Sequence, residues 1–85
     1  MGTAKLEIME ILTEVFRDVL DDPALELRDN TTAADVENWD SLNHIDLILA
    51  VERRFKVKFT TREVTSLQNV GELAELTQKK LDARN

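Results

Sequence analysis

Apolar side chains recur at helical spacing in three separate stretches of this 85-residue chain, and this pattern restricts the fold more than any other feature. Residues 4–20, residues 41–55 and the stretch after Asn69 each place them on one side of an amphipathic helix. The only strand-like alternation, over residues 55–59, is a single short run with no second strand to pair with. The spacing therefore predicts an all-α protein, with residues 55–59 as an extended connector.

Capping residues indicate where the helices begin and end. Thr3 is the expected N-cap of the first helix, and Pro23 is expected to end it, because the residue before a proline disfavours helical geometry. Residues 60–63 and 69–72 each show a capping-box pattern, with glutamate three positions after a threonine or asparagine. The first of these opens a short helix that ends near Ser66, and the second opens the last helix.

A chain of this length can build only one small core, because it buries about 60–65% of its unfolded surface. We therefore expect residues 1–85 to form a single domain, a four-helix bundle with three main helices and one short helix. Gly71 falls in the first turn of the last helix, where glycine costs up to about 1 kcal/mol relative to alanine. The helix tolerates this residue rather than gaining from it.

The connection between the first two main helices, residues 21–40, is long and has no helical period. Its one cation, Arg28, stands against seven carboxylates, so its net charge is −6, which equals the net charge of the chain. Such a loop is either a solvated segment, which charge alone favours, or a surface for basic partner enzymes. The 32–35 pattern predicts a single helical turn in it. Its candidate apolar anchors are Leu25, Leu27, Val36 and Trp39.

Composition excludes several classes of function. The chain has no cysteine, which excludes disulfides, thiolate metal sites and a protein-borne thiol, and its one histidine, His44, argues against a zinc site or a serine–histidine hydrolase. An acidic surface repels nucleic-acid backbones. No apolar run approaches the roughly 18 residues that cross a bilayer. We expect a cytoplasmic monomer without a metal, a nucleic-acid partner or a membrane-inserted segment.

Residues 41–55 carry two apolar stripes, although a helix in a one-core bundle needs only one. The first group suits the core and consists of Leu47, Ile48, Val51 and Phe55. The second group consists of Leu42, Ile45 and Leu49. This second group is either additional core or a stripe held at the surface for partners, and the periodicity does not decide between them.

The long loop enters the second main helix at Trp39-Asp40-Ser41-Leu42. Asp40 is a good N-cap, which leaves Ser41 as the first helical residue with its hydroxyl at the helix N-terminus. A phosphate attached there would meet unpaired N–H groups and the positive end of the helix dipole. No base is positioned by the sequence to activate Ser41 for hydrolysis. Taken alone, Asp-Ser-Leu is typical of an ordinary helix start.

The run from Asp40 to Phe55 resembles the signature of the acyl carrier protein family. The Asp-Ser-Leu motif, the apolar pattern that follows it and the 59–67 segment all fall at that family's spacing, and the likeness covers essentially the whole chain. The resemblance implies that a phosphopantetheinyl transferase attaches 4′-phosphopantetheine from coenzyme A to Ser41, between Asp40 and Leu42. Acyl groups would then be held on this arm as thioesters, and the protein would not itself be an enzyme.

The resemblance also implies that the second main helix docks acyl-loading and acyl-transferring enzymes. The residues that would do so are apolar Leu42, Ile45 and Leu49, acidic Asp40, Asp46 and Glu52, and basic Arg53. Arg53 and Arg54 stand where fatty-acid carriers have further carboxylates, which favours a specialised lipid or polyketide pathway over housekeeping fatty-acid synthesis. His44 also departs from the family pattern, and we interpret it as a packing or surface residue.

Two alternatives stay open at this point. An aminoacyl or peptidyl carrier would use the same arm on Ser41 with a different cargo, which the sequence does not distinguish. A non-covalent helical adaptor would bind a partner through the stripe that contains Ile45 and would function without Ser41. The sequence identifies neither the pathway, nor the acyl cargo, nor the partner enzymes.

Overall fold

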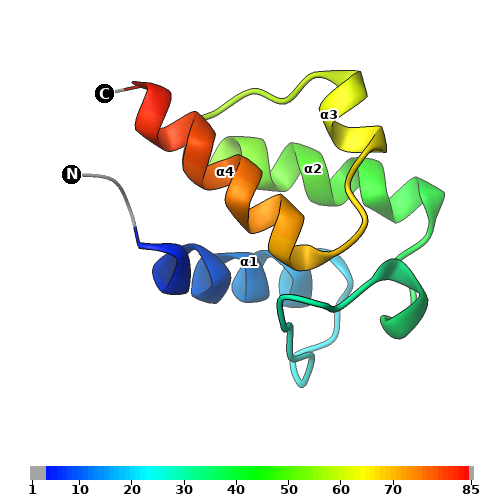
Figure 1. Ribbon diagram of the computed structural model, residues 1–85. Helices are drawn as coiled ribbons and strands as arrows, with labels where there is room; N and C mark the ends of the chain where they lie inside the picture. The colour runs from blue at the N-terminus through cyan, green and yellow to red at the C-terminus, as the bar shows by residue number, and fades with distance from the viewer. Residues whose placement is uncertain (1–3, 85) are drawn as a thin grey trace.

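The computed structural model describes residues 4–84, and these residues form helices joined by loops, without a strand. The elements are α1 (Lys5–Val19), the 3₁₀ turn η1 (Ala33–Asp35), α2 (Ser41–Phe55), α3 (Thr61–Thr65) and α4 (Val70–Arg84) (Figure 1). The predicted all-α class, with three main helices, one short helix and a long loop after α1, is confirmed.

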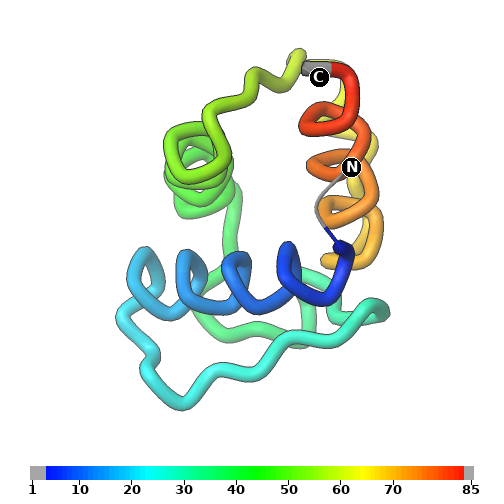
Figure 2. The backbone as a smooth tube through the Cα atoms, turned by 90° about the vertical axis from the view of Figure 1, so that its left-hand side faces the viewer, coloured from blue at the N-terminus to red at the C-terminus, as the bar shows by residue number. Residues whose placement is uncertain are grey.

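Helix α1 is the element against which the other two long helices pack. It contacts both α2 and α4, and Figure 2 shows it crossing the two of them. In the same view, the long loop between α1 and α2 runs below α1, on the side away from α2 and α4. The second main helix therefore begins at one end of the bundle, where the chain comes up from this loop.

The core lies between the inner faces of these three helices. The inner group predicted for α2 is confirmed, and the predicted one-sided apolar pattern after Asn69 is confirmed by the buried residues of α4, with Leu81 only partly buried. The buried hydroxyl of Thr77 donates to the carbonyl of Leu73 at 2.8 Å, so it costs little to bury. The core side chains of the long helices are Ile8, Leu12, Val15, Phe16, Leu47, Ile48, Val51, Phe55, Val70, Leu73, Ala74 and Thr77.

Helix α1 begins and ends differently from the prediction. The N-cap position is Ala4, whose side chain makes no capping bond, and Thr3 lies outside the described residues. The helix stops at Val19 because Asp21 adopts left-handed geometry, with φ 52°. The prediction that Pro23 ends this helix is therefore wrong, since the chain has already turned away two residues before the proline.

The two predicted capping boxes differ in detail. In the first, the Thr60 hydroxyl accepts from the Glu63 N–H at 3.1 Å, and the Glu63 carboxylate accepts from the Thr60 N–H at 2.8 Å. In the second, Asn69 accepts from the Glu72 N–H at 2.9 Å, but the Glu72 carboxylate accepts from Gln68 instead of Asn69. Both predicted helix starts are confirmed. The second box differs only in that the Glu72 carboxylate accepts from the N–H of Gln68, one residue before Asn69.

The long loop is fixed by apolar anchors and by local hydrogen bonds. The carboxylate of Asp35 accepts from the Thr32 N–H at 3.0 Å, which confirms the predicted helical turn as η1. The guanidinium of Arg17 donates to the Leu25 carbonyl at 2.6 Å and ties the loop to α1. The predicted anchors all pack in or against the core, and they are Leu25, Leu27, Val36 and Trp39.

The same loop also caps the start of α4. The Thr31 carbonyl accepts from the Val70 N–H, and the Asp29 carbonyl accepts from the Gly71 N–H, both at 2.8 Å. These bonds satisfy two of the four N–H groups that a helix start leaves unpaired. A Cβ at position 71 would lie 2.7 Å from the Asp29 oxygen, which is too near for a real contact. The glycine that disfavours the helix locally is therefore required by the approach of the loop.

We predict that Gly71→Ala lowers the free energy of unfolding by about 1–3 kcal/mol, because the added methyl group must displace the Asp29 backbone. In an unobstructed helix the same change would stabilise the protein by up to about 1 kcal/mol. Urea denaturation followed by circular dichroism measures the difference. Lys79→Ala, on the exposed face of the same helix, should change stability by less than about 0.5 kcal/mol. A more stable Gly71→Ala protein would contradict this explanation.

Glu63 links α3 to α4. Its carboxylate accepts from the Thr60 N–H and lies 2.9 Å from the Lys80 ammonium. The Thr60 hydrogen bond, followed by the interaction with Lys80, lowers the pKa of Glu63 below its ordinary value. Because the pKa is lower in the folded state, the resulting stabilisation is complete above the unfolded-state pKa. It is lost as the pH falls through the folded-state pKa.

We predict that Glu63→Gln weakens the acid dependence of stability, because glutamine can still accept from Thr60 but has no proton to take up. The free energy of unfolding of the unmodified protein should fall more steeply than that of the variant between about pH 5 and pH 2. Glu37→Gln is the matched control, since Glu37 is exposed and makes no hydrogen bond or ion pair within residues 4–84. Parallel pH curves for Glu63→Gln and the unmodified protein would refute the prediction.

Candidate functional site

Helix α2 begins at Ser41 because Asp40 caps it. The carboxylate of Asp40 accepts from the Asn43 N–H at 2.9 Å, and its carbonyl accepts the first helical bond, from the His44 N–H, at 2.8 Å. The backbone of Asp40 is extended, as expected for an N-cap residue. The predicted cap is confirmed.

A second contact fixes the direction from which the chain enters α2. The side-chain amide of Asn43 donates to the Asn38 carbonyl at 2.6 Å. Asn38 has φ 71°, a left-handed conformation that asparagine tolerates better than most residues. The sequence analysis did not single out this pair. An asparagine two residues before a cap, in a loop that must turn sharply, was the available signal.

Ser41 is exposed at the first position of α2, and its hydroxyl has no hydrogen-bond partner among the described residues. The N–H groups of Ser41 and Leu42 stand in the first turn, where the helix supplies no acceptor. A phosphate joined to the Ser41 oxygen would lie beside these donors, at the positive end of the helix dipole. The site is therefore accessible to a modifying enzyme and suited to a phosphodiester.

Trp39 and His44 form a hydrogen-bonded pair beside this site. The indole N–H of Trp39 donates to Nδ1 of His44 at 3.0 Å, and the two rings are stacked with centroids 6.0 Å apart. The other contact of Trp39 is edge-to-face with Phe16 of α1, at 5.0 Å. The pair therefore connects the start of α2 to the core. It also confirms that His44 has a packing role.

A recess of about 520 Å³ opens next to Ser41, between the start of α2 and α3. The recess is shallow and open to solvent, and Val64 of α3 and Leu67 just beyond it give it an apolar end. The cofactor that the resemblance implies has both a phosphate and a long flexible chain, so the helix start and the recess together fit it. Residues that line the recess include Ala33, Trp39, Ser41, His44, Val64 and Leu67.

The second apolar group of α2 lies at the surface. Leu42 is 78% exposed, Ile45 is 59% exposed and Leu49 is 46% exposed. Large apolar side chains gathered on one helix face and left in solvent are typical of an interaction site. The structure therefore excludes this group from the core and places it at the surface. We call these three residues the apolar stripe.

The two carboxylates predicted to accompany the stripe differ in their surroundings. Asp46 is exposed, and its carboxylate makes no hydrogen bond or ion pair with any residue that the structure describes. Glu52 is half-buried, and its carboxylate accepts from the Phe59 N–H at 2.8 Å, which fastens the connector between α2 and α3. One oxygen of Glu52 is thus engaged within the fold, whereas Asp46 is free to face a partner.

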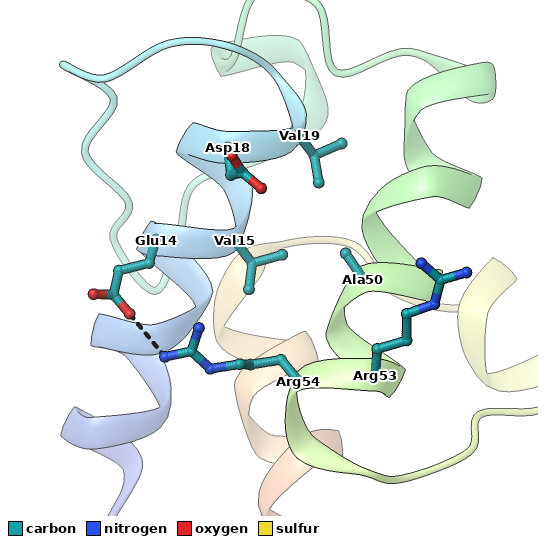
Figure 3. A pocket seen from close by; sticks show the side chains of 7 residues that line it. All are labelled: Glu14, Val15, Asp18, Val19, Ala50, Arg53 and Arg54. Carbon is teal, nitrogen blue, oxygen red and sulfur yellow. Dashed lines mark hydrogen bonds and ion pairs between the residues drawn. The ribbon is translucent and has the colours of Figure 1, made fainter.

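The two neighbouring arginines of α2 also serve different purposes. Arg54 forms an ion pair with Glu14 of α1, at 3.2 Å, across the groove between the two helices. Figure 3 shows Arg54 reaching toward Glu14, while Arg53 points away from α1. Arg53 is exposed and forms no ion pair within residues 4–84. Of the two, only Arg53 is available to a partner.

The chain belongs to the family of proteins with a phosphopantetheine attachment site, which it matches over residues 10–77. It is similar to acyl carrier proteins in particular. The acyl carrier protein of Acidothermus cellulolyticus is 28% identical over 75 residues, which cover 88% of this chain and 89% of that protein. The solution NMR structure of a holo acyl carrier protein from Geobacter metallireducens is 43% identical, with a TM-score of 0.85 over 91% of this chain and 88% of that one. The predicted family and its covalent phosphopantetheine cofactor are therefore confirmed.

Two further features bear on the class of protein. None of the helices in the described part is long and apolar enough to span a membrane. Residues 4–84 also contain no group of three or more histidine, aspartate or glutamate side chains placed to hold a metal ion. The candidate site consists of an exposed hydroxyl, a recess and an exposed helix face.

We predict that His44→Leu destabilises the protein by about 1–2 kcal/mol, because the partly buried indole N–H of Trp39 loses its acceptor. Trp39 is the only tryptophan, so its fluorescence reports directly on this site. Its emission should shift and its quenching by iodide should increase. His44→Asn, which can place an amide oxygen near the former Nδ1, should restore most of both properties. Unchanged fluorescence and stability in His44→Leu would show that the hydrogen bond contributes nothing.

Proposed function

We propose that this protein holds acyl groups as thioesters on a 4′-phosphopantetheine arm attached to Ser41, presents them to partner enzymes, and performs no catalysis itself. The observation that carries the proposal is the exposed Ser41 hydroxyl at the N-terminus of α2, in a chain that belongs to the phosphopantetheine attachment family. We further propose that residues 1–85 act as one carrier domain, as a monomer in the cytoplasm.

The residues around Ser41 support its role as the attachment point. Its Oγ would form the phosphodiester when a phosphopantetheinyl transferase supplies the arm from coenzyme A. The N–H groups of Ser41 and Leu42 would stabilise the phosphate, and Asp40 keeps the helix start in place through Asn43. The arm would bring the thiol that this cysteine-free chain lacks. The shallow recess between α2 and α3 would give the arm an apolar surface beside Ser41.

We assign partner docking to the outer face of α2. The apolar stripe would fill a hydrophobic hollow on an acyl-loading or acyl-transferring enzyme, and Asp46 would face a cation of that enzyme. Glu52 and Arg53 stand at the far end of the same face. Arg53, placed where a fatty-acid carrier has a carboxylate, supports a specialised lipid or polyketide pathway. An aminoacyl or peptidyl cargo would use the same surface.

Attachment is tested by intact-mass measurement after incubation with coenzyme A and a broad-specificity phosphopantetheinyl transferase. We predict that the unmodified protein gains one phosphopantetheine group and that Ser41→Ala gains none, because Ser41 supplies the bond-forming oxygen. Ser66→Ala is a close control, since Ser66 is the only other serine and is also exposed. Loss of loading in Ser66→Ala, or loading that persists in Ser41→Ala, would move the attachment point elsewhere.

The exposed stripe would also suit a non-covalent adaptor, which is the alternative that this surface supports. In that case no transferase in a panel would load the unmodified protein, and Ser41→Ala would leave partner binding intact. Ile45→Ala would abolish that binding without loss of stability, because Ile45 is mostly in solvent. Leu6→Ala is the control, since Leu6 is 71% exposed on α1, outside the stripe.

A further inference from the structure

The end of α2 and the connector that follows it surround a recess of about 430 Å³. Three of its lining side chains are cations, Arg53, Lys56 and Lys58, which we call the basic patch. Leu49, at the end of the apolar stripe, lines the same recess. The basic patch is therefore continuous with the surface to which we assign partner docking.

The charges of the basic patch are not neutralised within the fold. All three cations are exposed, and none forms an ion pair with a residue that the structure describes. The recess has one acidic lining residue, Glu52, and its carboxylate accepts from the Phe59 N–H. Arg54, by contrast, is paired with Glu14. A local positive field thus persists on a chain whose net charge is −6.

Helix stability does not account for this cluster. Cations near a helix C-terminus complement the dipole, which is a sufficient reason for Arg53. Lys58 lies beyond the helix, in the connector, where the dipole effect has faded. Lys56 stands in left-handed geometry, with φ 59°, where glycine would avoid the strain. Glycine would suit this position better, so the turn itself does not require Lys56.

We propose that the basic patch binds carboxylates of the partner enzyme at the same time as the apolar stripe occupies its hydrophobic hollow. The proposal rests on the carrier function and names the chemistry of the partner. That partner has an apolar hollow for Leu49 and acidic side chains beside it. A membrane with anionic lipids is disfavoured as the occupant, because the remaining surface of the protein is acidic.

The order of charges along α2 then fixes how the partner is oriented. Asp40 and Asp46 lie toward the Ser41 end, and the basic patch lies at the opposite end. At 1.5 Å per residue, about 18 Å separate Ser41 from Arg53. A partner with a basic rim near Ser41 and an acidic rim at the far end matches this order. A partner that is basic along the whole face meets repulsion at the patch, so the patch selects against it.

The proposal is tested with two synthetic helical peptides that share one apolar face and differ only in carrying glutamates or lysines on the polar face. Each is titrated into the full ¹⁵N-labelled protein, and binding is followed by amide chemical shifts. The glutamate peptide should bind at least about tenfold more tightly, with shifts concentrated in residues 49–58, and added salt should reduce the difference. This preference opposes the net charge of the chain, so non-specific attraction would give the reverse result.

The variant R53E/K56E/K58E should reverse the preference, while Lys79→Glu, which makes the charge change of one of these substitutions on the exposed face of α4, should leave it in place. Lys58→Glu alone should reduce the preference about two- to threefold. Because Lys58 lies outside any helix, this single variant tests the proposal if the triple variant does not fold. Failure of the unmodified protein to prefer the glutamate peptide, whether both peptides bind equally or neither binds, overturns the proposal.

Two other binding partners of the basic patch would give distinct experimental results, and either result overturns the proposal. Self-association in sedimentation that R53E/K56E/K58E abolishes would assign the patch to the acidic loop of a second copy. Binding to phosphatidylglycerol vesicles that the same variant abolishes would assign it to a lipid surface. Loading of Ser41 is measured separately by intact mass. Absent loading defeats the carrier function, whereas absent peptide preference with normal loading defeats the basic patch alone.

Discussion

The hydrogen bond from the Asn43 N–H to the Asp40 carboxylate determines where α2 begins, and the other properties of the site depend on that start. Because α2 begins at Ser41, this residue stands in the first turn, with its hydroxyl in solvent and free N–H groups beside it. Trp39, held by His44 and Phe16, keeps the incoming chain in position. The candidate site is therefore a property of the helix start, supported from the core.

Local sequence patterns predicted the helices well but did not predict the contacts between distant segments. Periodicity located the three long helices, and four-residue capping patterns located η1 and α3. The sequence did not show why glycine stands at position 71, because the reason is the adjacent backbone of Asp29, 42 positions away along the chain. The pairing of Arg54 with Glu14 was hidden for the same reason. A pattern within one segment reports which face is apolar, but it does not report what approaches that face.

The candidate site was predictable to a similar degree. The residues of the helix start and the stripe follow from the sequence, since Asp40 is a recognisable cap and periodicity separates Ile45 from the core face. The exposure of the stripe did not follow, because a second apolar group could equally have extended the core. The three-dimensional packing decides the matter: α1 packs against one face of α2, and Ile45 remains exposed.

Different positions of α2 thus have different roles, and helical geometry keeps these positions apart. Its first turn offers the hydroxyl, its inner face holds the core, and its outer face runs from Asp46 to Arg53 with a reversal of charge. Successive residues differ by about 100° around the axis, so Arg54 can hold α1 while Arg53 remains in solvent. A charge on the outer face can therefore change without disturbing the packing that positions Ser41.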